Sequence, residues 1–123
     1  MEEDRREHFR LVYPEQQRGF VKLYGHPYPI QDISQKGIKI IVEEPNAIEE
    51  WQLDTAVEAI VFLVFGAKIH IKAKVLRIEE EYVVFYLEDP IPFKTMIEEQ
   101  RFLIKEFVNA QSNKSPESDP SRS

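Results

Sequence analysis

The stretch from Ala56 to Ile78 reads AVEAIVFLVFGAKIHIKAKVLRI and predicts a β-hairpin. Ala56 to Phe65 is rich in Val, Ile and Phe, which favour strands, and Gly66-Ala67 supplies a tight turn. From Lys68 to Ile78, apolar and polar residues alternate, as in a strand with one buried and one solvated face. The expected inward residues are Ile69, Ile71, Ala73 and Val75, and the outward ones are His70, Lys72 and Lys74.

Shorter strand patterns flank this hairpin on both sides. They lie at Phe20 to Tyr24, Tyr28 to Ile33, Ile38 to Val42 and Tyr82 to Leu87. A turn is expected at Gly25-His26-Pro27, and a long acidic loop from Glu43 to Asp54. About six antiparallel strands in a chain of this length favour a mainly β fold in the form of a small barrel.

The period of the sequence changes to that of a helix after Pro92. Apolar residues from Phe93 to Val108 share one face of a helix of about four turns, and Thr95 and Glu98 have the spacing of a capping box. The predicted fold is a small six-stranded antiparallel β-barrel with one C-terminal amphipathic helix. Residues 1–13 would form an arginine-bearing arm, residues 14–110 the barrel and helix, and residues 111–123, which lack large apolar side chains, a disordered tail.

The composition restricts the classes of function. The 123 residues carry a net charge of −6, which argues against binding to long nucleic acid but leaves room for a small anion at a local arginine cluster. The sequence has no cysteine, and His8, His26 and His70 share no metal-ligand spacing, so neither a metal nor a cofactor is expected. Because it shows no secretion signal and no apolar run of about 20 residues, a cytoplasmic protein without membrane insertion is expected.

Two short motifs carry the candidate binding chemistry. They are Arg6-Glu7-His8-Phe9-Arg10, directly preceded by Arg5, and Asp32-Ile33-Ser34-Gln35-Lys36-Gly37. An arginine fork can donate to guanine O6 and N7 or pair with a phosphate, whereas a carboxylate can accept from guanine N1 and N2. Serine adds a hydroxyl, and glycine permits a positive φ or the close approach of a ligand. Taken singly, the first motif is better explained as a solvated arm and the second as a turn between strands.

Together, and in this order ahead of strands and a closing helix, the motifs resemble the RxxxR and (D/N)xSxxG motifs of PilZ domains, over roughly Asp4 to Val108. The resemblance implies a PilZ-like split barrel and a non-enzymatic receptor for the bacterial second messenger cyclic di-GMP. Such a receptor would relay binding to an unidentified downstream protein that controls motility, surface attachment in biofilms or exopolysaccharide production. Two glycines common in the family are missing, at Asp54-Thr55 and in the strand before Phe85, which concerns turn geometry rather than the ligand site.

The resemblance assigns ligand-binding roles to seven residues. Arg5, Arg6 and Arg10 would grip guanine and phosphate, Asp32 and Ser34 would read a guanine edge, and Gly37 would permit the approach. Arg77, at the outward side of its strand, is a further candidate, although a plain surface arginine is the favoured interpretation of this residue. In the family, an arginine directly before RxxxR tends to accompany a paired ligand. Arg5 therefore implies two molecules of cyclic di-GMP per chain.

Two other classes of function were weighed against this one. A protein-interaction module that binds no nucleotide would work through the acidic loop and the tail. An enzyme, using Asp32 or Glu79 to Glu81, lacks a paired acid and base with an activated nucleophile. Trp51 in the acidic loop is either a core plug or a partner contact, and the plug is favoured.

Overall fold

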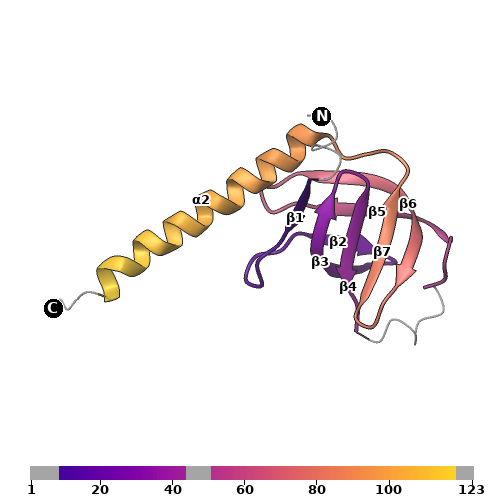
Figure 1. Ribbon diagram of the computed structural model, residues 1–123, viewed down its shortest axis with the longest axis horizontal. Helices are drawn as coiled ribbons and strands as arrows, with labels where there is room; N and C mark the ends of the chain where they lie inside the picture. The colour runs from indigo at the N-terminus through magenta and orange to yellow at the C-terminus, as the bar shows by residue number, and fades with distance from the viewer. Residues whose placement is uncertain (1–8, 44–50, 119–123) are drawn as a thin grey trace.

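The computed structural model describes residues 9–43 and 51–118, which form seven strands and one helix (Figure 1). The elements are β1 (Arg10–Val12), β2 (Phe20–Leu23), β3 (His26–Ser34), β4 (Gly37–Ile41), β5 (Ala56–Phe62), β6 (Lys68–Ile78), β7 (Tyr82–Leu87) and α2 (Phe93–Ser118). Every predicted strand is present. β5 is shorter than expected because the chain already turns at Leu63, whose N–H donates to the Ala67 carbonyl over 2.9 Å.

Six of these strands form an antiparallel barrel, which confirms the predicted fold class. The strand order is β3-β2-β5-β6-β7-β4, and pairing of β3 with β4 closes the ring. β1 is an additional strand that pairs with the end of β3, placing Leu11 opposite Ile33 and Val12 opposite Asp32. Closure removes most of the sheet edges that would otherwise remain unpaired.

Alternate strand residues fill the interior of the barrel, as expected for a small closed sheet. The fully buried side chains include Ile30, Ile33, Ile38, Ile40, Val61, Val83 and Phe85. Trp51 is only 4% exposed, and its ring centroid lies 5.5 Å from that of Tyr28 and 5.9 Å from that of Phe85. Trp51 is therefore a core plug, the favoured of the two readings.

The β2–β3 turn lies earlier than predicted. Tyr24 and Gly25 occupy it with φ angles of 54° and 76°, two consecutive left-handed residues as in a type I′ hairpin turn. His26 and Pro27, which were expected in the turn, already belong to β3.

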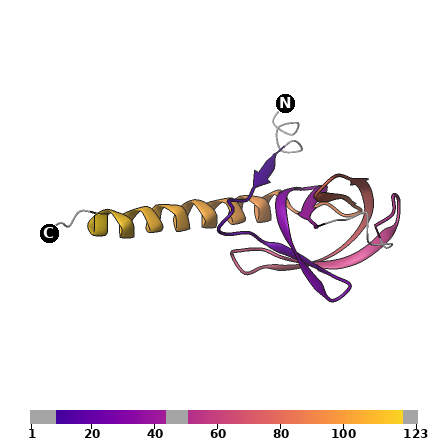
Figure 2. The same cartoon turned by 90° about the horizontal axis from the view of Figure 1, so that it is seen from below.

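The helix α2 begins at Phe93, as predicted, but ends later than predicted, and its capping residue differs. The N–H groups of Thr95 and Met96 both donate to the Pro92 carbonyl, over 3.0 and 3.2 Å, so the helix begins before Thr95, and Thr95 is not its N-cap. It continues to Ser118, so the residues from Gln111 to Ser118, expected within a disordered tail, are helical. Residues 119–123 of that tail lie outside the described residues. Figures 1 and 2 show the helix projecting away from the barrel.

Glu99 anchors α2 to the barrel through a carboxylate that is 1% exposed. Its Oε2 accepts from the Tyr13 hydroxyl and from the Val64 N–H (2.7 Å), and its Oε1 accepts from the Phe65 N–H (2.9 Å). Burial, and then the hydrogen bond to Glu99, raises the pKa of Tyr13 above its ordinary value. Tyr13 directly follows β1, and Val64 and Phe65 lie in the β5–β6 turn, so one carboxylate joins three parts of the chain.

Candidate ligand-binding site

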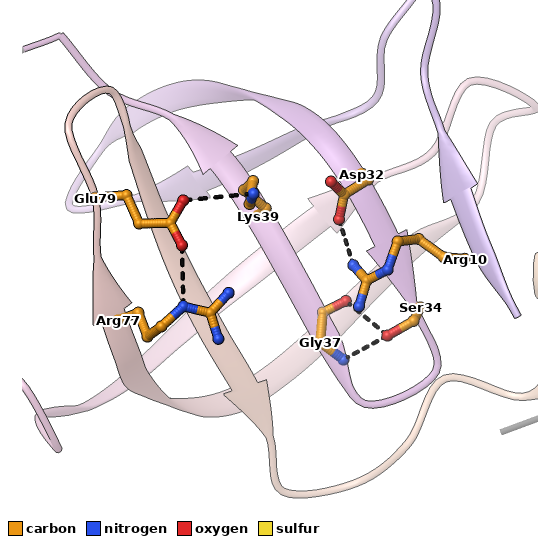
Figure 3. Close-up of polar contacts among 7 residues, drawn as sticks. All are labelled: Arg10, Asp32, Ser34, Gly37, Lys39, Arg77 and Glu79. Atoms are coloured by element: carbon orange, nitrogen blue, oxygen red, sulfur yellow. Dashed lines mark hydrogen bonds and ion pairs between the residues drawn. The ribbon is translucent and has the colours of Figure 1, made fainter. Parts of the chain in front are cut away.

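Five of the seven predicted site residues line one open pocket on the outer face of the barrel, with a volume of ≈ 360 Å³. These five are Arg10, Asp32, Ser34, Gly37 and Arg77. Arg5 and Arg6 lie outside the described residues. The sequence places these five residues on β1, β3, β4 and β6, and closure of the barrel brings them together (Figure 3).

A bulge in β3 turns the second motif toward this pocket. The pairing of β3 with β4 skips Gln31: Ile30 is opposite Ile40, whereas Asp32 is opposite Lys39. Without the extra residue, Ile30 and Asp32 would share the inner face, because strand side chains alternate with a period of two. The Ile30 carbonyl accepts from Arg18 Nη1 (3.0 Å), and the Gln31 carbonyl accepts from the Tyr13 N–H (3.1 Å). The displaced backbone carbonyls are thus satisfied, and Asp32 faces outward.

Arg10 and Asp32 form an ion pair across the β1–β3 junction. Arg10 Nη1 donates to Asp32 Oδ1 over 2.5 Å (Figure 3). The Arg10 side chain is 54% exposed and that of Asp32 only 10%, so the carboxylate is fixed in the sheet while the arginine reaches it from outside. The two residues expected to contact complementary edges of guanine are therefore adjacent, and in the free protein they are paired with each other.

Ser34 and Gly37 close the tight connection between β3 and β4. Ser34 Oγ accepts from the Gly37 N–H over 3.1 Å and donates to the Gly37 carbonyl over 3.3 Å. Besides lining the pocket, the second motif therefore also stabilises the turn between β3 and β4. Gly37 is not among the residues with positive φ, so left-handed backbone does not explain the glycine. A Cβ at this position would lie 3.4 Å from Ser34 Oγ, so the absent side chain instead leaves that hydroxyl accessible from the pocket.

A second bulge, in β6, determines the direction of Arg77. Val75 pairs with Phe85 and Arg77 with Val84, which leaves Leu76 as the extra residue. Strict alternation from Ile69 to Val75 would have placed Arg77 on the inner face. Arg77 is outward, as predicted, but the cause is the bulge rather than simple alternation.

Sequence reasoning missed Lys36 and Lys39, which line the pocket, and Glu79, which pairs with Lys39 and Arg77. Arg77 Nε donates to Glu79 Oε2 over 2.9 Å, and Lys39 Nζ lies 3.4 Å from Glu79 Oε1 (Figure 3). The hydrogen bond from Arg77, supported by the charge of Lys39, lowers the pKa of Glu79. Lys39 could have been found from the sequence. It is a polar residue between the inward Ile38 and Ile40, so its side chain points outward, and it lies on the strand that follows the Asp32 motif.

The pocket is positively charged although the protein is acidic. Four cationic side chains, Arg10, Lys36, Lys39 and Arg77, line it together with one carboxylate, Asp32. The whole chain carries a net charge of −6. A larger hollow of ≈ 670 Å³ on another part of the surface has no such excess, because two lysines there face Glu58, Glu88 and Asp89. The charge distribution therefore favours the smaller pocket for an anionic ligand.

Within the described residues, no helix is both long and apolar enough to cross a membrane. The same part of the chain contains no group of three His, Asp or Glu side chains placed to hold a metal ion.

Comparisons with known proteins agree with the fold. An uncharacterized Legionella protein, Lpg0364, aligns with a TM-score of 0.51 and 13% identity over 87% of this chain and 99% of its own. K. pneumonia MrkH, solved as a complex with c-di-GMP, aligns with a TM-score of 0.51 and 17% identity over 89% of this chain and 53% of its own. Among curated proteins, no sequence gives a significant match. The model of the PilZ domain matches residues 4–108, and the chain belongs to the PilZ family.

Proposed function

We propose that the protein binds cyclic di-GMP in the pocket between Arg10 and Arg77 and acts as a second-messenger receptor. One observation carries the proposal: the residues of both family motifs that the structure describes line a single positively charged pocket on an acidic protein. PilZ domains are non-catalytic cyclic di-GMP receptors, so no enzymatic activity is proposed. The proposal is supported by the similarity in fold to K. pneumonia MrkH, which was solved as a complex with c-di-GMP.

The proposed roles follow from hydrogen-bonding chemistry. Arg10, together with Arg5 and Arg6, supplies guanidinium donors for guanine O6 and N7 or for a phosphate. Asp32 accepts from guanine N1 and N2, and Ser34 adds a hydroxyl beside it. Because Arg10 and Asp32 are paired in the free protein, binding exchanges their ion pair for contacts with the ligand. This exchange lowers the net gain from each contact but makes recognition depend on both partners at once.

The proposal includes the stoichiometry and the output of binding. Arg5, directly before the first motif, provides an additional charge and a flat guanidinium plane, which suits an intercalated pair of ligands, so two molecules per chain are expected. Binding would order the part of the arm that precedes β1 over the pocket and present a new surface to a downstream protein in the cytoplasm that controls motility, attachment or exopolysaccharide production.

Calorimetric titration of the full chain with cyclic di-GMP, compared with cyclic di-AMP, tests the proposal. Adenine has an amino group in place of O6 and lacks the N2 donor, so arginine and Asp32 each lose a partner, at about 1–3 kcal/mol apiece. We expect binding of about two cyclic di-GMP molecules per chain and at least tenfold weaker binding of cyclic di-AMP, by roughly 1.4 kcal/mol per factor of ten. Equal affinity for the two dinucleotides would contradict the guanine-reading roles.

The second candidate function is a protein-interaction module without a nucleotide ligand. It is favoured by the exposed apolar side chains of Ile104, Phe107 and Val108 on α2. A titration with neither heat nor a spectral change upon addition of cyclic di-GMP would support this alternative.

A further inference from the structure

Glu79 binds two cations in the way that a phosphodiester would. Its two carboxylate oxygens are divided between two donors, with Oε1 3.4 Å from Lys39 Nζ and Oε2 2.9 Å from Arg77 Nε (Figure 3). A phosphodiester also carries one negative charge spread over two outer oxygens. Guanidinium and ammonium groups that satisfy a carboxylate therefore satisfy a phosphate with the same geometry.

Arg77 lies across the pocket from Arg10, and Lys39 lies between them on the strand next to Asp32 (Figure 3). Asp32, Lys39, Val84 and Arg77 are register partners on the consecutive strands β3, β4, β7 and β6. Three strand spacings separate Asp32 from Arg77, or about 14 Å. Figure 3 shows the guanidinium groups of Arg10 and Arg77 entering from opposite sides and pointing toward each other. Cationic side chains therefore line both ends of the pocket, which suits a ligand with two separate phosphates.

Glu79 is held loosely enough to be displaced. The side chains of Arg77, Glu79 and Lys39 are 57%, 34% and 25% exposed, and ion pairs this accessible to water contribute little stability. Glu79 follows the last residue of β6, so its side chain can leave without loss of a strand pairing. Among the described residues, the hydrogen bond of Arg77 to Glu79 uses only Nε, which leaves its two terminal nitrogens for a further acceptor.

We propose that Lys39 and Arg77 form a phosphate subsite of the pocket, and that Glu79 occupies this subsite in the free protein as an internal competitor. The inference rests on the proposed function and deepens it. Cyclic di-GMP displaces the Glu79 carboxylate, and its phosphate takes the donors of both cations. Glu79 thereby weakens binding and raises the ligand concentration at which the receptor responds.

The test compares Glu79→Gln with Glu81→Gln in calorimetric titrations with cyclic di-GMP. Both substitutions remove one negative charge from the segment between β6 and β7, but the exposed Glu81 side chain makes no ion pair with Lys39 or Arg77. We expect Glu79→Gln to bind about two- to fivefold tighter, the size of a surface ion pair, and Glu81→Gln to bind like the parent. The double substitution Lys39→Gln with Arg77→Gln should weaken binding, and in that background Glu79→Gln should bring no gain.

The outcomes separate this inference from the proposed function. If the parent binds and Glu79→Gln does not bind more tightly than Glu81→Gln, the competitor role is wrong while the receptor function stands. An equal gain in the background without Lys39 and Arg77 would also overturn it, because the effect would then be a general charge effect. Absence of binding by both the parent and Glu79→Gln would remove both proposals, whereas binding by Glu79→Gln alone would show a competitor strong enough to mask the site.

Discussion

Replacement of Glu99 by alanine should destabilise the protein far more than an exposed substitution in the same helix. The carboxylate is 1% exposed and accepts from the Tyr13 hydroxyl and from the N–H groups of Val64 and Phe65. Each buried donor left unpaired costs about 1–3 kcal/mol, and the two N–H groups are only partly buried, so the total loss should be about 3–5 kcal/mol. A typical domain is stable by only about 5–15 kcal/mol.

Glutamine at the same position should be tolerated better. If its amide oxygen occupies the place of Oε2, it still accepts from Tyr13 and Val64, and only the Phe65 N–H faces an amide N–H. One unpaired donor should reduce the free energy of unfolding by about 1–3 kcal/mol. The order of stability expected is therefore parent, Glu99→Gln, Glu99→Ala.

Urea unfolding followed by tryptophan fluorescence measures these differences. Trp51 is the only tryptophan in the sequence and is buried in the core, so its emission reports unfolding of the barrel. Glu98→Ala is the matched control, because it makes the same substitution on the exposed side of α2 and should change the free energy of unfolding by less than about 0.5 kcal/mol. If Glu99→Ala unfolds within that same range, the carboxylate does not anchor the helix and the reasoning is refuted.

Three further predictions concern the pocket, and a fourth concerns Tyr13 beside Glu99. Arg10→Ala should weaken cyclic di-GMP binding by about 1.5–3 kcal/mol in calorimetry. The melting temperature should change little, because the Arg10 side chain is 54% exposed. If the variant binds like the parent and melts at a much lower temperature, the role of the arginine is structural. Gly37→Ala should fold normally, because the new Cβ makes only ordinary contacts of 3.4 and 3.6 Å. It should bind cyclic di-GMP at least about tenfold more weakly, because the methyl group lies beside the Ser34 hydroxyl. An affinity equal to that of the parent would rule out the close-approach role of Gly37. Arg5→Leu should reduce the calorimetric ratio from about two ligands per chain toward one, and a ratio of one in the parent would remove the role of Arg5. The raised pKa of Tyr13 keeps its hydroxyl protonated in the folded protein, whereas an unfolded tyrosine ionises near pH 10. The free energy of unfolding, measured in urea titrations, should therefore fall above about pH 10. Tyr13→Phe should lack this decline.

Local periodicity was sufficient to identify every element of this fold except β1, whose residues Arg10 to Val12 were expected in the N-terminal arm. The alternation in β6 and the helical spacing after Pro92 depend on neighbours within a few residues, and both are written directly in the sequence. The turn at Tyr24 and the cap at Pro92 were misplaced by one to three residues, because several nearby residues satisfy the same turn and capping rules. The length of α2 was underestimated, since its last residues carry no apolar face to mark them as helical.

The two motifs, by their order and spacing, indicated the family and four residues of the candidate pocket, and Arg77 was a separate candidate. Only the tertiary structure decided in which direction these side chains point and which residues they contact. Asp32 and Arg77 face outward because bulges at Gln31 and Leu76 interrupt the alternation, and a bulge reflects the fit between two strands rather than the sequence of one. In the sequence, Glu79 and Glu99 are ordinary charged residues. Strand pairing brings Lys39 to Glu79 beside Arg77, and packing of the helix brings three donors to Glu99. The sequence alone could not show these arrangements, because they depend on contacts between residues far apart in the chain.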